Sequence, residues 1–127
     1  MAGTKTLLLV LLIFLLVIAA GMAESDPDNS ENATRIEIEI EGRHLVGEDN
    51  VFRVYQGMQV TLVVTSDEAA SLHLHGYDIE FDLIPGKPAT VSLIAHATGR
   101  YPVTSHGWGG GHEHGHQTLF YLEVYPK

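Results

Sequence analysis

An alternation of isoleucine and glutamate is the feature that most limits how this chain can fold. In residues 36–41, three isoleucines alternate with three glutamates, so the pattern repeats every two residues. This period places isoleucine on one face of a β-strand and carboxylate on the other. We therefore expect a half-buried antiparallel strand here. Its row of glutamates would protect a sheet edge from pairing with another chain, so we also expect a monomer.

Further short strands are predicted along the chain, separated by turn-forming residues such as Glu48-Asp49-Asn50 and Pro85-Gly86-Lys87-Pro88. They cover residues 51–55, 59–66, 72–74, 77–83, 89–95, 99–104 and 118–125. No segment after residue 23 shows a helical stripe that continues for three turns. The sequence therefore predicts an all-β fold, a Greek-key β-sandwich of about seven or eight strands.

The N-terminal residues have the layout of an export signal. Residues 7–20 are apolar without interruption, follow Lys5 and precede the small residues Gly21 and Ala23. This run is shorter than the roughly 20 residues of a membrane-spanning helix. We expect residues 1–23 to be a signal peptide or an uncleaved signal-anchor helix, residues 24–33 a flexible acidic linker, and residues 34–127 the domain. The domain is then periplasmic or extracellular, and it touches a membrane only through an uncleaved N-terminal segment.

Charge and cysteine content exclude several functions. Without residues 1–23, the chain keeps six basic and sixteen acidic residues, so nucleic acid is not an expected partner. The acidic surface instead raises the local concentration of cations. The chain has no cysteine, which excludes disulfides, a cysteine nucleophile, a structural cysteine-zinc site and a blue-copper centre.

Histidines form two clusters with the spacing of metal ligands. Seven of the eight histidines lie between His73 and His116, and neutral imidazole is a common ligand of transition metals. In His73-Leu74-His75-Gly76, the two imidazoles would share one face of a strand. We expect His75 to be a ligand ahead of His73. The alternative is that one of the pair is a buried, hydrogen-bonded histidine.

The second cluster is the loop from His106 to His116, which contains four histidines. Four glycines separate His106 from His112, and their entropic cost is offset if the loop folds tightly around an ion. The alternative is a histidine-rich tract that binds metal weakly and without defined geometry. His96 and His44 lack such a context and are expected to be ordinary histidines.

Residues 53–126 resemble the cupredoxin family. The resemblance lies in Gly57-Met58-Gln59-Val60-Thr61-Leu62-Val63-Val64 as an early strand, in Ser66-Asp67 and His75-Gly76-Tyr77 as the first-ligand region, and in Gly99-Arg100-Tyr101-Pro102-Val103-Thr104-Ser105-His106 as the C-terminal ligand strand. Ser105 stands where the family has its copper-binding cysteine, and Met58 is the only methionine in the predicted domain. The family's site of two histidines, cysteine and axial methionine cannot form here.

The segment His73-Leu74-His75-Gly76 also resembles the His-x-His-Gly motif of multicopper oxidases. One small domain lacks the other ligands of a trinuclear cluster, so this similarity does not imply oxidase activity.

We therefore predict a cysteine-free site built mainly from nitrogen ligands. His75 and His106 are its expected core, one or two of His112, His114 and His116 complete it, and His73 is held in reserve. Glu113 and Asp78 are candidate carboxylates for orienting an imidazole, although both are also ordinary turn residues. Trp108 either shields the ion or caps the sandwich edge. Such a site suits Cu(II) and also accepts zinc or nickel.

These features predict an exported copper-binding protein that sequesters copper, maintains its homeostasis or delivers it, with a copper-donating or copper-receiving protein as partner. One alternative is a mononuclear copper enzyme or electron-transfer partner that keeps a coordination position open. Another is an accessory or adhesion domain without metal, whose histidines sense pH. The sequence favours binding over catalysis.

Overall fold

The computed structural model describes residues 32–108 and 116–127, in which every regular element is a β-strand. The strands are β1 (Ala33–Glu41), β2 (His44–Leu45), β3 (Val51–Tyr55), β4 (Gln59–Ser66), β5 (Ala70–Leu74), β6 (Ile79–Leu83), β7 (Ala89–Ile94), β8 (Gly99–His106) and β9 (Gln117–Tyr125). None of the described segments forms a helix long and apolar enough to cross a membrane.

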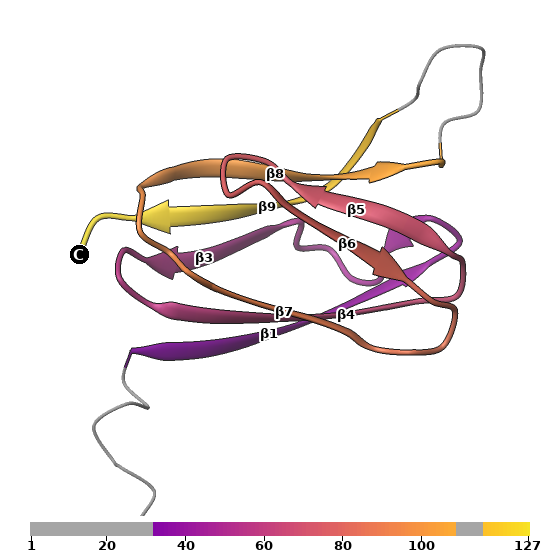
Figure 1. The fold of residues 1–127 in the computed structure, drawn as a ribbon, viewed down its shortest axis with the longest axis horizontal. Coiled ribbons are helices and arrows are strands. Elements are labelled where there is room, and N and C mark those ends of the chain that lie inside the picture. The colour runs from indigo at the N-terminus through magenta and orange to yellow at the C-terminus, as the bar shows by residue number, and fades with distance from the viewer. Residues whose placement is uncertain (1–31, 109–115) are drawn as a thin grey trace, which may run out of the picture.

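Two sheets pack face to face in a sandwich (Figure 1). One sheet has four strands in the order β2-β1-β4-β7, and the other has five in the order β3-β9-β8-β5-β6. Consecutive strands repeatedly pass from one sheet to the other, as in Greek-key sandwiches. The predicted all-β sandwich is confirmed, with nine strands because β2 was not expected.

The strand that contains residues 36–41 does not pair as expected. β1 runs parallel to β4 from Ala33 opposite Gln59 to Ile40 opposite Ser66, and only its last two residues pair antiparallel with β2. The antiparallel prediction is therefore wrong for the main partner. Alternating burial depends on one face packing against a core, and it carries no information about the direction of the neighbouring strand.

A tight turn joins β5 to β6 and shortens β6 relative to the prediction. Gly76 has a φ of 84° and Asp78 a φ of 54°, so both residues are in the left-handed region. Regular pairing therefore begins at Ile79 opposite Leu74, not at Tyr77. The ring of Tyr101 packs directly against the open side of Gly76.

The core between the sheets determines which residues face outward on the five-stranded sheet. Leu72 and Leu74 of β5 and Phe120 of β9 are fully buried in it. Because successive side chains on a strand point to opposite faces, His73 lies on the outer face of this sheet. The fold thus places His73 outside the core, with its side chain 18% exposed.

Candidate metal centre

Three adjacent strands bring two histidines and a carboxylate together on the outer face of the five-stranded sheet. His73 of β5 lies directly opposite Glu80 of β6, and Ser71, two residues before His73, lies opposite His106 of β8. Cross-strand neighbours on one face are close enough to share a ligand. The ligand atoms of His73, Glu80 and His106 all lie within 4.8 Å of one another.

Two ring nitrogens in this group have unfulfilled bonding capacity. Nε2 of His73 and Nε2 of His106 are both buried, and neither has a hydrogen-bond partner. Buried polar atoms are nearly always paired, and an unpaired one costs about 1–3 kcal/mol. An ion coordinated by both nitrogens would remove this cost. Asp78 extends into solvent, and its Oδ1 lies 3.4 Å from Nε2 of His73.

The donor atoms suit a metal with nitrogen and oxygen ligands. Two ligands of one ion, each bound at about 2.0–2.1 Å, lie at most about 4 Å apart, so small side-chain rotations would close the group around an ion. Two imidazoles and a carboxylate fit Cu(II) or Zn(II), and they leave coordination positions open. His73, Glu80 and His106 are therefore the residues that would hold the ion.

His75 lies next to the group and has a polar partner of its own. Its Nε2 is 2.8 Å from Oγ1 of Thr104, and its ring centroid is 4.1 Å from that of His73. Loss of solvation lowers the pKa of His75, and the nearby His73 and His106 lower it further. The sequence ranks His75 ahead of His73, whereas the geometry places the unpartnered nitrogen on His73.

Of the other histidines, one lies close to the group of His73, Glu80 and His106, and two lie far from it. The exposed His116 is close to the group, with its ring centroid 4.5 Å from that of His106. His96 packs instead against Tyr77, and His44 lies on the short strand β2. The predicted ligands His112 and His114 and the predicted carboxylate Glu113 lie outside the described residues.

Sequence reasoning missed Glu80. Its only signal is register: if residues 75–78 form the turn of a hairpin, His73 and Glu80 face each other. That turn depends on the left-handed conformations of Gly76 and Asp78. Asp78 is a non-glycine residue in a conformation that such residues adopt only occasionally, so the turn was hard to predict.

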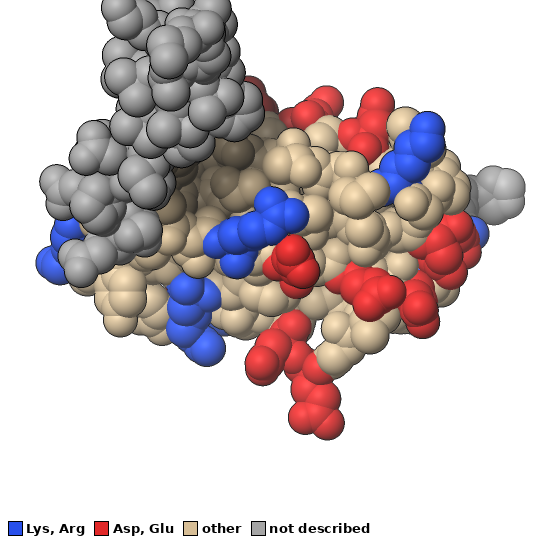
Figure 2. Space-filling model, turned by 90° about the horizontal axis from the view of Figure 1, so that it is seen from below, with Lys and Arg blue, Asp and Glu red and all other residues tan. Residues whose placement is uncertain are grey.

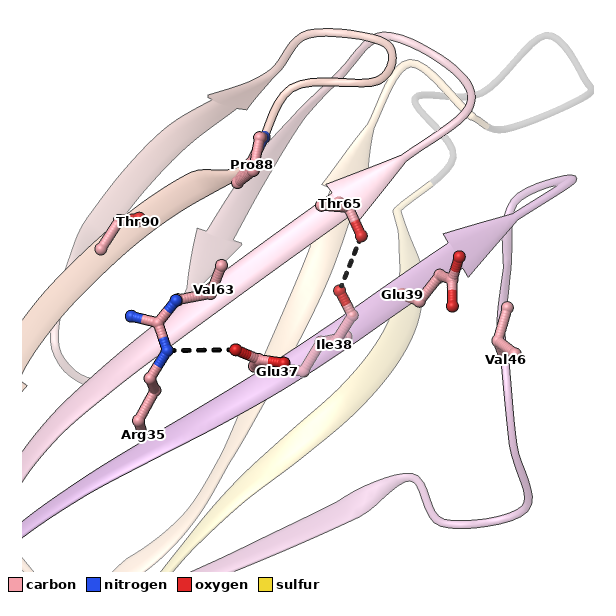
Figure 3. Close-up of a pocket in the computed structure, with 9 residues that line it drawn as sticks. All are labelled: Arg35, Glu37, Ile38, Glu39, Val46, Val63, Thr65, Pro88 and Thr90. Atoms are coloured by element: carbon pink, nitrogen blue, oxygen red, sulfur yellow. Dashed lines mark hydrogen bonds and ion pairs between the residues drawn. The ribbon is translucent and has the colours of Figure 1, made fainter.

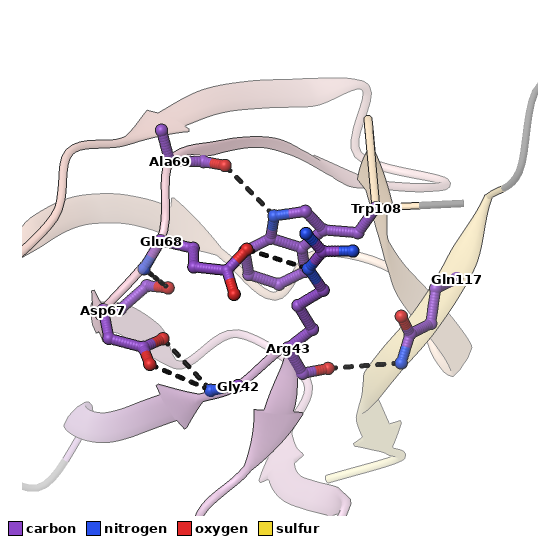
Figure 4. Close-up of polar contacts among 8 residues, drawn as sticks. Gly42, Arg43, Asp67, Glu68, Ala69, Trp108 and Gln117 are labelled. Carbon is purple, nitrogen blue, oxygen red and sulfur yellow. Dashed lines mark hydrogen bonds and ion pairs between the residues drawn. The ribbon is translucent and has the colours of Figure 1, made fainter. Parts of the chain in front are cut away.

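Hydrogen bonds fix both ends of the loop between β8 and β9 (Figure 4). The indole Nε1 of Trp108 donates to the carbonyl of Ala69 over 3.0 Å, and the ring is buried in the core. At the other end, Nε2 of Gln117 donates to the carbonyl of Arg43 over 3.2 Å. Arg43 in turn pairs with Glu68 over 2.8 Å. Residues 108 and 117 are thus tied to the turns that follow β1 and β4.

Ser105, which matches the cysteine position of cupredoxins, points away from the histidines. It pairs with Leu72, whose side chain is in the core, and it is completely buried. Its hydroxyl lies 3.5 Å from the carbonyl oxygen of Gln117. The histidine group and Ser105 therefore lie on opposite faces of β8.

A groove on the outer face of the four-stranded sheet offers less chemistry (Figure 3). It has a volume of about 530 Å³, and its polar lining includes Arg35, Glu37, Glu39 and Thr65. Arg35 pairs with Glu37 over 3.1 Å, and both side chains are largely exposed. No histidine lines this groove. The histidine face is the stronger candidate site.

Replacing Glu80 with glutamine tests the carboxylate. We expect the Glu80→Gln variant to bind Cu(II) about tenfold more weakly, because a neutral amide oxygen is a poorer ligand for a cation than a carboxylate. Asp82→Asn is the matched control, since Asp82 lies on the same face of β6 but outside the group. Competition titration against a chelator measures both variants. Equal losses in the two variants would assign the effect to general charge and remove Glu80 from the site.

The lowered pKa of His75 predicts a pH-dependent stability of the metal-free protein. Because the folded state disfavours protonated His75, the unfolded state binds that proton more readily below its pKa of about 6.5. The free energy of unfolding should therefore be level above about pH 7 and fall as the pH is lowered through 6.5. Urea unfolding between pH 5 and 8 measures this. The His75→Gln variant should flatten the profile, and an unchanged slope would contradict the assignment.

This chain matches known proteins in structure but not in sequence. Models of protein families give no match, and curated sequences give none either. A chain from a heme-copper terminal oxidase dimer superposes with a TM-score of 0.61 at 20% identity, over 96% of this chain and 95% of that one. A copper binding protein in its apo form gives a TM-score of 0.59 at 9% identity, over 74% of this chain and 89% of that one.

A third similar structure is the periplasmic domain of cytochrome oxidase subunit II (CoxB) from Bradyrhizobium japonicum. It superposes with a TM-score of 0.57 at 16% identity, over 72% of this chain and 83% of that domain. Similarity at such low identity establishes the fold. The described residues therefore form a cupredoxin-like domain, in a chain that lacks the cysteine of blue-copper sites.

Proposed function

We propose that this chain is an exported copper-binding protein that holds Cu(II) through His73, His106 and Glu80. The observation that carries the proposal is the pair of buried Nε2 atoms that lack a hydrogen bond and lie beside the carboxylate of Glu80. Imidazole affinity among divalent metals is greatest for Cu(II). The apo copper binding protein among the structural neighbours supports the same metal.

The surroundings of the site suit sequestration or delivery of copper. The site lies on the outer face of the five-stranded sheet, outside the core between the sheets. We infer that His75 and the loop histidines His112, His114 and His116 complete the coordination or pass the ion on. Without a thiolate ligand, the ion lacks the feature that tunes blue copper for rapid electron transfer.

Copper loading tests this proposal directly. The full chain should bind about one Cu(II), and the electron paramagnetic resonance spectrum should show hyperfine splitting from at least two nitrogens. Zn(II) should compete for the same site with lower affinity. Several weakly bound ions with a heterogeneous spectrum would instead indicate a scavenging tract and would overturn the proposed site.

A second candidate function is association with a respiratory oxidase. The superposition covers almost the whole of this chain and almost the whole of a chain from a heme-copper terminal oxidase dimer. The full chain, purified with a mild detergent from its native membranes, would then carry haem-containing subunits in fixed ratio. Recovery of the chain without haem would exclude this candidate and leave copper binding unaffected.

A further inference from the structure

Exposed apolar side chains gather at the end of the sandwich remote from His106. Of the five large hydrophobic residues that are exposed in the described part of the chain, three lie here. Tyr55 is 59% exposed, Ile94 is 58% exposed and Tyr125 is 40% exposed. Single exposed apolar residues are common, whereas a group of them marks a contact surface.

Strand register places these three residues at the same end of the sandwich, on its two opposite outer faces. Tyr55 ends β3 opposite Tyr125 of β9, and their ring centroids are 6.3 Å apart. Ile94 ends β7 opposite Gln59, the first residue of β4. The two tyrosines lie on the outer face of one sheet and Ile94 on the outer face of the other, because the residues before them, Val54, Val124 and Leu93, are buried. We call Tyr55, Ile94 and Tyr125 the apolar collar.

The N-terminal residues join the domain at this same end. The amide of Gln59 donates to the carbonyl of Asn32 over 2.7 Å, and Nζ of Lys127 donates to Oδ1 of Asn32 over 3.3 Å. Eleven residues, 21–31, separate Asn32 from the apolar run at residues 7–20. At about 3.6 Å per residue, they reach no further than about 40 Å. The apolar run is thus attached to the end of the domain that carries the collar.

Basic and acidic side chains are concentrated at opposite ends of the domain. Basic side chains lie towards the collar, among them Arg35, Arg100 and Lys127, whereas Glu41, Asp67 and Glu68 lie where β1 and β4 end. Figure 2 shows most of the visible acidic side chains at the centre and on the right of the domain. Anionic lipid headgroups attract basic residues and repel acidic ones. Among the described residues, the collar end is therefore the more basic end of the domain, whereas the linker at residues 24–31 that joins it carries four acidic residues.

We propose that the N-terminal segment stays uncleaved as an anchor and that the apolar collar rests on the lipid surface, which holds the metal centre at the far end of the domain, facing away from the bilayer. Tyrosine is enriched at membrane interfaces because its ring is apolar and its hydroxyl is polar. The collar has two tyrosines and an isoleucine on both sheet faces, so it suits end-on contact with the headgroup layer. This orientation does not depend on copper binding and leaves the histidine face open to a soluble partner.

Site-specific labelling of the cysteine-free chain tests the contact. A single Ile94→Cys substitution carries an environment-sensitive fluorophore, and Ile84→Cys is the matched control, since Ile84 is 55% exposed but lies in the turn after β6. The full-length variants are reconstituted in vesicles of phosphatidylcholine with about one quarter phosphatidylglycerol. We expect brominated lipids to quench the label at position 94 at least about twofold and to leave the label at position 84 unchanged.

The remaining outcomes decide the proposal. A Tyr55→Cys variant should respond as Ile94→Cys does, which guards against a local folding defect at either site. Equal quenching at positions 84 and 94, or none at either, would overturn the orientation and indicate that the collar faces a protein partner or solvent. Copper binding measured on the same vesicles reports separately on the metal centre, so failure of one proposal is distinct from failure of the other.

Discussion

The His106→Ala variant should bind Cu(II) at least about a hundredfold more weakly than the unaltered chain. Removing a group that only supports a metal ligand typically costs 10- to 100-fold in affinity, and loss of a ligand should cost at least as much. His106 is one of two histidines whose buried Nε2 has no partner within the described part of the protein. Its replacement leaves His73 and Glu80 as a two-donor site. Isothermal titration, with chelator competition for the unaltered chain, measures the difference.

A distant histidine provides the control for this loss. His96 packs against the ring of Tyr77 and contributes no atom to the metal group, so His96→Ala should change the affinity by less than about twofold. His73→Ala should resemble His106→Ala, and the double variant should lose less than the sum because both residues act on one ion. If His106→Ala retains full affinity, the copper binds to the histidine tract of the loop, and the site on the sheet face is wrong.

The sequence predicted the strands well because their signals are local. Alternation in residues 36–41 and turn residues between the other apolar segments depend only on neighbours along the chain. The parallel pairing of β1 with β4 joins segments whose first residues, Ala33 and Gln59, are 26 positions apart. Nothing in either segment encodes that direction. Fold class was therefore predictable, whereas the pairing of this strand was not.

The composition of the candidate site also depends on strand pairing that the sequence does not encode. The spacing of His73 and His75 indicated a shared strand face, but β5 ends at Leu74, so only His73 keeps a regular position on the sheet. Glu80 joins the group through the register of the β5–β6 hairpin, which depends on the conformation of the turn. The candidate histidines could be identified from the sequence. Which of His73 and His75 is the better ligand candidate, however, depends on where β5 ends.

That turn also gives the second large expected effect, in the Gly76→Ala variant. Gly76 has a φ of 84°, and a Cβ added to it would approach Cε1 of Tyr101 to 2.6 Å. The Tyr101 ring cannot easily withdraw, because its hydroxyl lies 3.0 Å from the carbonyl oxygens of both Ala97 and Thr98 and shares its one proton between them. Left-handed strain costs about 1–2 kcal/mol and overpacking about 1–3 kcal/mol. We expect the free energy of unfolding to fall by about 3 kcal/mol, measured by urea denaturation.

The Gly57→Ala variant distinguishes backbone strain from overpacking. Gly57 has a nearly identical φ of 89°, and no atom beyond its own residue and its two chain neighbours lies within 4 Å of the position that a Cβ would occupy. Gly57→Ala should therefore cost only the conformational part, about 1 kcal/mol. In a Tyr101→Ala background, Gly76→Ala should become as mild as Gly57→Ala, because the obstructing ring is gone. Equal costs for both glycines in the unaltered background would show that the ring yields. In that case the Tyr101 ring would not be what holds the turn in shape. The backbone conformation alone would then position His75 and Asp78.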